Sequence, residues 1–123
     1  MRVIARAFCW LFAAGAASAI AAETVPTIRP FAGGQYMIYG GGLGDVYAPK
    51  PGDTKLYLEL SGDAARRIFD QLGRASEKKM CADPDDVLRM KGDIACTRSH
   101  DGKHVCQMGY DLTTGKSANA TIC

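Results

Sequence analysis

Apolar and polar residues alternate most clearly in the last third of the chain, from Val87 to Cys123. Such a two-residue period is typical of strands that bury one face. Two glycine-containing turns divide this segment, at 100–102 and at 113–115. A three-residue hairpin loop commonly ends with a residue in the left-handed conformation, which glycine adopts at little cost. The pattern therefore predicts a three-stranded antiparallel meander.

The two turns also predict the register of the meander. The first turn places Cys96 opposite Cys106, and the second places Tyr110 opposite Ala118. These registers bring the apolar positions of all three strands to one face of the sheet, and Gly92 is expected to form a bulge within the first strand. The residues predicted on that face are Leu88, Met90, Ile94, Cys96, Cys106, Met108, Tyr110, Leu112, Ala118, Ala120 and Ile122.

Two strands and one helix are predicted before the meander. Residues 35–39 are aromatic and branched and lie between glycines, and residues 54–60 alternate leucines with polar residues and Tyr57. Ser61 is suited to cap a helix, and Gly73 is suited to follow its last turn. The apolar residues between them have helical spacing: Ala64, Ala65, Ile68, Phe69 and Leu72.

These elements predict a two-layer α+β domain, with one amphipathic helix packed on an antiparallel sheet in the order β-β-α-β-β-β. Ile68 and Phe69 are expected to pack on the sheet face that carries Met108 and Tyr110. Glu23 to Gly34 is expected to be an extended lead-in. Residues 40–53, rich in glycine and proline, are expected to form an irregular loop, and loops of this length are often functional.

The N-terminus indicates export. Basic residues at Arg2 and Arg6 precede a short apolar run that ends in small residues near Ala22, which is typical of a cleaved secretory signal. We therefore expect a signal peptide at 1–22 and a single small domain at 23–123, the alternative being an uncleaved anchor. Removing the two arginines leaves 13 basic and 13 acidic residues. This neutral balance argues against nucleic-acid binding and against binding to an anionic membrane, so no membrane insertion is expected after cleavage.

Four cysteines remain after cleavage, which in a small exported domain indicates two disulfides and a periplasmic or secreted location, most simply in a bacterium. The predicted register favours Cys96 with Cys106, which leaves Cys81 for Cys123. The alternative is that Cys96 and Cys106 pair separately with Cys81 and Cys123. A change of one residue in the turn would reverse this preference.

One group of residues has metal-ligand chemistry, because Cys96, His100, His104 and Cys106 fall in one hairpin. A disulfide would remove both thiolates, so we expect no metal and no cofactor. Catalysis is not indicated either, since no nucleophile motif accompanies the two histidines. A small hydrolase that uses His100 or His104 as a base remains an alternative.

The expected function is therefore that of an exported cell-envelope binding module, not an enzyme, which acts on another envelope or secreted protein as an inhibitor or a protective partner. A small-ligand or metal carrier is the alternative. Contacts are expected from the long loop and from the tip of the first hairpin, since binding residues favour loops on a rigid scaffold. The candidate binding residues are Tyr39, Gly42, Asp45, Tyr47, Arg98, His100, Asp101 and His104.

Overall fold

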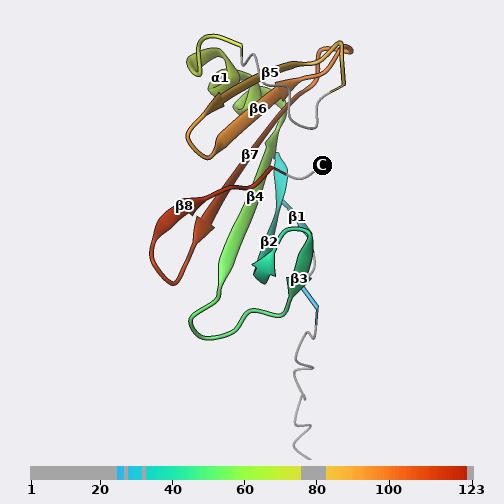
Figure 1. Ribbon diagram of the computed structural model, residues 1–123. Helices are drawn as coiled ribbons and strands as arrows, with labels where there is room; N and C mark the ends of the chain where they lie inside the picture. Colours follow the sequence, from blue (N-terminus) through green and yellow to red (C-terminus); the bar gives the residue numbers. More distant parts are fainter. Residues whose placement is uncertain (1–24, 27, 32, 76–82, 122–123) are drawn as a thin grey trace, which may run out of the picture.

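The computed structural model describes residues 25–26, 28–31, 33–75 and 83–121. Within these residues one helix packs on an antiparallel sheet of eight strands, which confirms the predicted α+β class (Figure 1). The elements are β1 (Arg29–Phe31), β2 (Gly34–Gly42), β3 (Asp45–Tyr47), β4 (Lys55–Ser61), α1 (Gly62–Gln71), β5 (Val87–Lys91), β6 (Ile94–Arg98), β7 (His104–Asp111) and β8 (Lys116–Ala118). The expected signal peptide at 1–22 lies outside the described residues, as do Cys81 and Cys123.

The sheet has the order β1-β2-β4-β7-β6-β5, with β3 beside β2 and β8 beside β7. The observed order of elements contains three more strands than predicted. One lies in the expected lead-in and one in the expected loop at 40–53. The third arises because the predicted strand at 88–98 is two strands, β5 and β6, so the C-terminal meander has four strands and not three.

The first predicted turn is confirmed. Gly102 has φ 84° and donates its N–H to the Ser99 carbonyl at 2.8 Å. This turn sets Cys96 opposite Cys106, and the two form a disulfide with their Cα atoms 4.0 Å apart. The face of the sheet that carries this disulfide also carries the helix, and it is called the helix face below.

The predicted faces of β5 are wrong. Lys91 pairs with Ile94, so Gly92, with φ 57°, begins a two-residue turn and is not a bulge inside one strand. Because side chains alternate, this turn reverses the parity that a continuous strand would have. Arg89 therefore lies opposite Cys96 on the helix face, while Leu88 and Met90 lie on the other face.

The register of the second turn is also wrong by one residue. Tyr110 pairs with Ser117, not with Ala118, because the loop has four residues, 112–115. The Asp111 carbonyl accepts the N–H of Gly115 at 2.7 Å. As a result Ala118 and Ala120 lie on the opposite face of the sheet from Tyr110, which we call the hairpin face.

Helix α1 begins and ends where the sequence predicts. Ser61 is its N-cap residue with an extended backbone, although its side chain makes no capping hydrogen bond. Asp63 lies in the first turn, where a negative charge suits the helix dipole. Gly73 follows the helix with φ 77°. The helix contacts β4, β6 and β7.

The helix-side core forms under α1. Phe69 is 1% exposed and packs with Ala65 against the disulfide. Met108 and Tyr110 share this face, as expected, but they lie further along β7 than Cys106, beyond the buried cluster under the helix. The partly buried residues around this core are Leu60, Ile68, Leu72, Val87 and Ile94.

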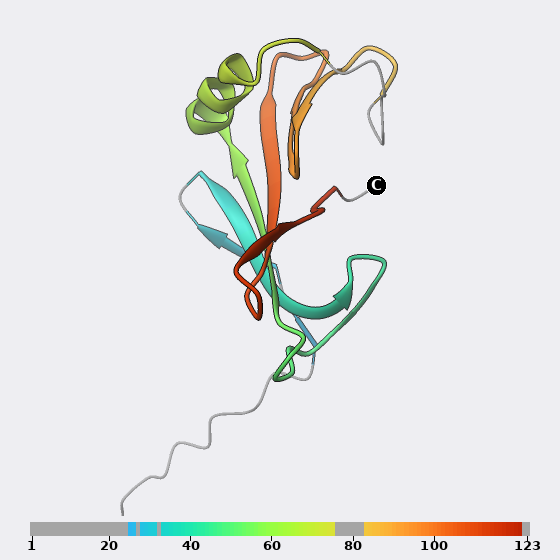
Figure 2. The same ribbon diagram turned by 60° about the vertical axis from the view of Figure 1, so that its left-hand side comes forward.

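A second core lies on the hairpin face, towards the other end of the sheet. There Tyr57, which is 1% exposed, packs with Met37, Tyr39 and Ala120. The segment at 40–53 is not an irregular loop. It contains the β2–β3 hairpin, which bends out of the main sheet and supplies Leu43 and Val46 to this core (Figure 2).

Candidate functional site

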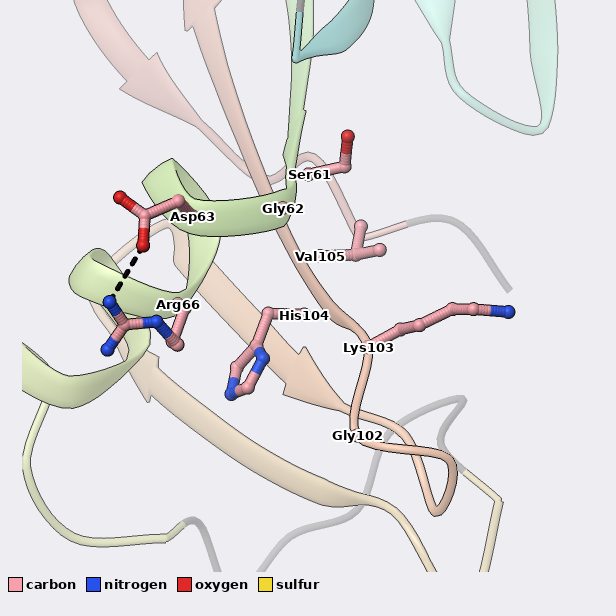
Figure 3. A pocket seen from close by; sticks show the side chains of 8 residues that line it. All are labelled: Ser61, Gly62, Asp63, Arg66, Gly102, Lys103, His104 and Val105. Atoms are coloured by element: carbon pink, nitrogen blue, oxygen red, sulfur yellow. Dashed lines mark hydrogen bonds and ion pairs between the residues drawn. The ribbon is translucent and has the colours of Figure 1, made fainter.

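A pocket of about 410 Å³ lies between the first turn of α1 and the end of the β6–β7 turn (Figure 3). Its walls come from two segments about 40 positions apart in the sequence. Of the candidate binding residues, it includes His104. The lining residues are Ser61, Gly62, Asp63, Arg66, Gly102, Lys103, His104 and Val105.

The disulfide braces the wall that β6 and β7 supply. The bridge from Cys96 to Cys106 closes a segment with a sequence separation of 10 that contains the whole turn. On its other side, the Cys106 Sγ lies 3.3 Å from the carbonyl oxygen of Ala65 in α1. Both walls of the pocket are therefore fixed to the same buried point.

His104 lies at the junction of the pocket and the helix-side core. Its ring meets the Phe69 ring edge to face, with the centroids 5.1 Å apart. Among the described residues, no hydrogen bond is made by its imidazole nitrogens. Two guanidinium groups also lie over the Phe69 ring, that of Arg89 at 4.1 Å and that of Arg98 at 5.7 Å from the ring centroid. Arg89 is held further by a 2.9 Å hydrogen bond from its Nη1 to the Phe69 carbonyl.

Most charges at the rim of the pocket are paired. Arg66 donates to Asp63 at 2.7 Å, and this bond, with that from Arg67, keeps the pKa of Asp63 below its usual value. Lys103 lies 2.9 Å from Asp101. Hydrogen bonds from Ser99 and Lys103 likewise lower the pKa of Asp101. The rim thus presents fixed ionised pairs and no strong net charge.

The arrangement in the pocket favours binding over catalysis. Figure 3 shows the Ser61 hydroxyl pointing away from the His104 ring, so the two do not form a nucleophile–base pair. With Cys96 and Cys106 in a disulfide, the zinc alternative loses two of its four ligands. No group of three or more His, Cys, Asp or Glu suited to a metal ion occurs in the described ranges.

The other predicted residues of the β6–β7 turn lie outside the pocket. Arg98, His100 and Asp101 are exposed. The backbone N–H of His100 donates to the Asp86 carboxylate at 3.1 Å, which ties the turn to the segment before β5.

The remaining candidate residues lie at the opposite end of the sheet and are not brought together with the pocket (Figure 1). Tyr39 is buried in the hairpin-side core. Gly42 and Asp45 face each other across the exposed tip of the β2–β3 hairpin. Sequence reasoning thus joined two regions that the fold separates.

Tyr47 and the glycines around it have a structural explanation. Its ring covers the backbone of Gly40 and Gly41, where an added Cβ would come within 2.4 and 2.5 Å of the nearest atoms. The Tyr47 hydroxyl donates to Asp53, as do the Lys55 ammonium and, at 3.0 Å, the Gly41 N–H. These donors, Lys55 first, keep the pKa of Asp53 well below its usual range.

The residues that sequence analysis missed are the helix-side wall of the pocket. Asp63 and Arg66 have the ordinary pattern of a solvated helix face, and nothing local shows that the β6–β7 turn lies beside them. Lys103 was adjacent to two predicted residues and is the one that proximity could have found.

Comparison with protein-family models, with curated proteins and with solved structures gives no match for this chain. In the part of the chain that the structure describes, no helix is both long and apolar enough to cross a membrane. The functional argument therefore rests on the geometry of the site.

Proposed function

We propose that this chain is an exported binding module of the cell envelope, without catalytic activity, that holds another envelope or secreted protein. The observation that carries the proposal is the pocket beside His104, whose two walls are fixed to one buried disulfide. A preformed, rigid recess lowers the ordering cost of binding, which favours a recognition role.

The size and lining of the pocket suit a protein partner. Hot spots at protein interfaces are anchor side chains that enter well-packed recesses, surrounded by a polar rim. Here a recess of about 410 Å³ has Val105 in its wall and the Asp63–Arg66 pair at its rim. We expect the partner to insert one large side chain and to meet the rim with polar groups.

Export is part of the same proposal. The disulfide between Cys96 and Cys106 supports an oxidising compartment, periplasmic or extracellular. The expected signal at 1–22 points the same way.

Site-specific photo-cross-linking in the native envelope tests this function. A photoreactive amino acid is placed at Lys103, on the rim, and at Thr114, an exposed control in the β7–β8 turn. The proposal predicts a discrete protein adduct from position 103 alone, and its loss when Val105→Glu is added to a chain that keeps its circular dichroism spectrum. Equal adducts from both positions, or none from 103, would contradict it.

A small-ligand carrier is the second candidate, because about 410 Å³ also lies within the usual range of small-molecule sites. Native mass spectrometry of protein isolated from its envelope separates the two. A bound small molecule that Val105→Glu releases would favour the carrier and would leave position 103 without a protein adduct.

A further inference from the structure

The helix face carries an apolar patch that α1 does not reach. It occupies the three central strands, with two rows of side chains in register. Tyr110 is 38% exposed, and the other five are half-buried, unlike Tyr57 and Met37 on the opposite side of the same strands. The first row is Tyr36, Leu58 and Met108, and the second is Ile38, Leu56 and Tyr110; together they are called the open patch.

None of the six positions is charged, whereas the other face of the same strands carries Lys55, Glu59 and Asp111. A patch without charge can meet an identical patch without bringing like charges together. Exposed contiguous apolar surface of this kind marks an interaction site.

The pattern of the open patch is complementary to itself. The two aromatic residues, Tyr36 and Tyr110, occupy diagonal corners, the two leucines form the middle column, and Met108 and Ile38 occupy the other corners. If a second copy is turned over about an axis along β4, Tyr36 lies over Met108 of that copy and Tyr110 over its Ile38. An axis across the strands gives the same kind of pairing, with each aromatic ring over an aliphatic side chain.

We infer that the open patch binds a second copy of this chain, in a two-fold dimer with the sheets face to face. Such an isologous contact repeats every pairing twice, so a self-complementary pattern is what it requires. A hollow of about 200 Å³ beside Met108 and Tyr110 gives a side chain from β2 of the other copy room to enter. This surface is separate from the pocket, so the dimer and the proposed partner do not compete.

The area of the patch sets the strength of the dimer. With strands about 4.8 Å apart and side chains of one face about 6.8 Å apart along each strand, the patch and its rim cover roughly 300 Å² of sheet. Stable interfaces bury about 800 Å² on each partner. The dimer is therefore weak and reversible, with half-association on the order of 100 µM.

Sedimentation velocity of the purified protein between about 10 µM and 1 mM tests the inference. The sedimentation coefficient should rise with concentration towards that of a dimer. Tyr110→Glu should weaken association at least about tenfold, because it places a charge in the patch of each copy. Thr114→Glu adds the same charge outside the patch and should behave as the wild type.

A dilution series followed by methyl NMR on the unmodified chain gives a second readout that needs no variant. Concentration-dependent shifts should be confined to Ile38, Leu56, Leu58 and Met108. A protein that stays monomeric to 1 mM would overturn the inference, as would shifts that map elsewhere or equal association of Tyr110→Glu and Thr114→Glu.

Discussion

The two cores of this protein lie on opposite faces and towards opposite ends of one sheet, and they are built from different materials. The helix-side core combines a helix, Phe69 and a covalent bridge between adjacent strands. The hairpin-side core has no described covalent bond and depends on two buried tyrosines and on a strand that bends over them. Each core covers only part of its face.

This difference separates the roles of the two ends. The disulfide end holds two walls of a pocket in place, while the hairpin end uses its polar groups to hold itself. Tyr57, for example, donates its hydroxyl to Glu59 at 2.6 Å and accepts from Gln107 at 3.1 Å, and its burial, with the bond to Glu59, raises its pKa. The tyrosines that suggested a binding surface are thus structural, and the candidate site lies at the other end.

The largest expected effect comes from the helix-side core. Phe69→Ala should lower the free energy of unfolding by about 3–5 kcal/mol, because it leaves a cavity beside the disulfide and removes the ring under Arg89 and Arg98. Urea unfolding followed by circular dichroism measures this. Ile68→Ala, at a half-buried position, should cost less. A loss below about 1 kcal/mol for Phe69→Ala would show that the helix is not packed as described.

Removal of the bridge should be felt at one end only. Replacing Cys96 and Cys106 together by Ala should lower stability by up to about 3 kcal/mol, the chain-entropy value for a loop of this size. In hydrogen exchange the amide of Gly102 should lose protection, whereas that of Gly41, held by Asp53, should keep it. An equal loss at both amides would mean that the two ends unfold as one unit.

The hairpin face can be broken by a single methyl group. A Cβ at Gly109 would come 2.7 Å from the Ala118 carbonyl oxygen and 3.0 Å from the Ala120 Cβ, so Gly109→Ala should cost about 1–3 kcal/mol by overpacking. Gly42→Ala is the control, since a Cβ there meets nothing within 4 Å. Thermal unfolding of the two variants should differ clearly, and similar melting temperatures would contradict the crossing of the C-terminal segment over Gly109.

Acid should weaken both ends, each through one carboxylate. The pKa values of Asp53 and Asp101 are lower in the folded state than in the unfolded chain, so the stability they contribute is present above about pH 4 and is lost as the pH falls. Asp53→Asn should therefore be less stable than the wild type at neutral pH and should lose less stability on acidification. Asp101→Asn should do the same with local effects in the β6–β7 turn. Unfolding midpoints between pH 2 and 7 measure this, and an unchanged pH profile in both variants would refute it.

The parts of the fold that could be predicted have local determinants. Gly102 needs a positive φ, and Ser61 and Gly73 mark the ends of the helix, so the first hairpin, its disulfide register and α1 follow from the sequence. The second turn was not decided locally, because a three-residue and a four-residue loop both place Gly115 at its end. The longer loop is stabilised by Asp111, whose carboxylate accepts the N–H groups of Thr113 and Thr114.

That single residue changes the account of the whole lower sheet. It moves Ala118 and Ala120 to the hairpin face, which places Ala120 over Tyr57 and leaves Met108 and Tyr110 uncovered. The pocket could not be predicted for a related reason. Its walls meet only through the packing of α1 on the disulfide, and no local pattern of residues encodes that contact.

The central claim is that the two faces of the central strands differ, the hairpin face being covered and the helix face open beyond α1. Two methionines report on it directly, since Met37 on the hairpin face is 5% exposed and Met108 belongs to the open patch. In a methyl-labelled sample at about 10 µM, where the weak dimer is dissociated, a soluble gadolinium chelate should broaden the Met108 methyl signal several-fold more than that of Met37. Equal broadening of the two signals, or stronger broadening of Met37, would contradict the account.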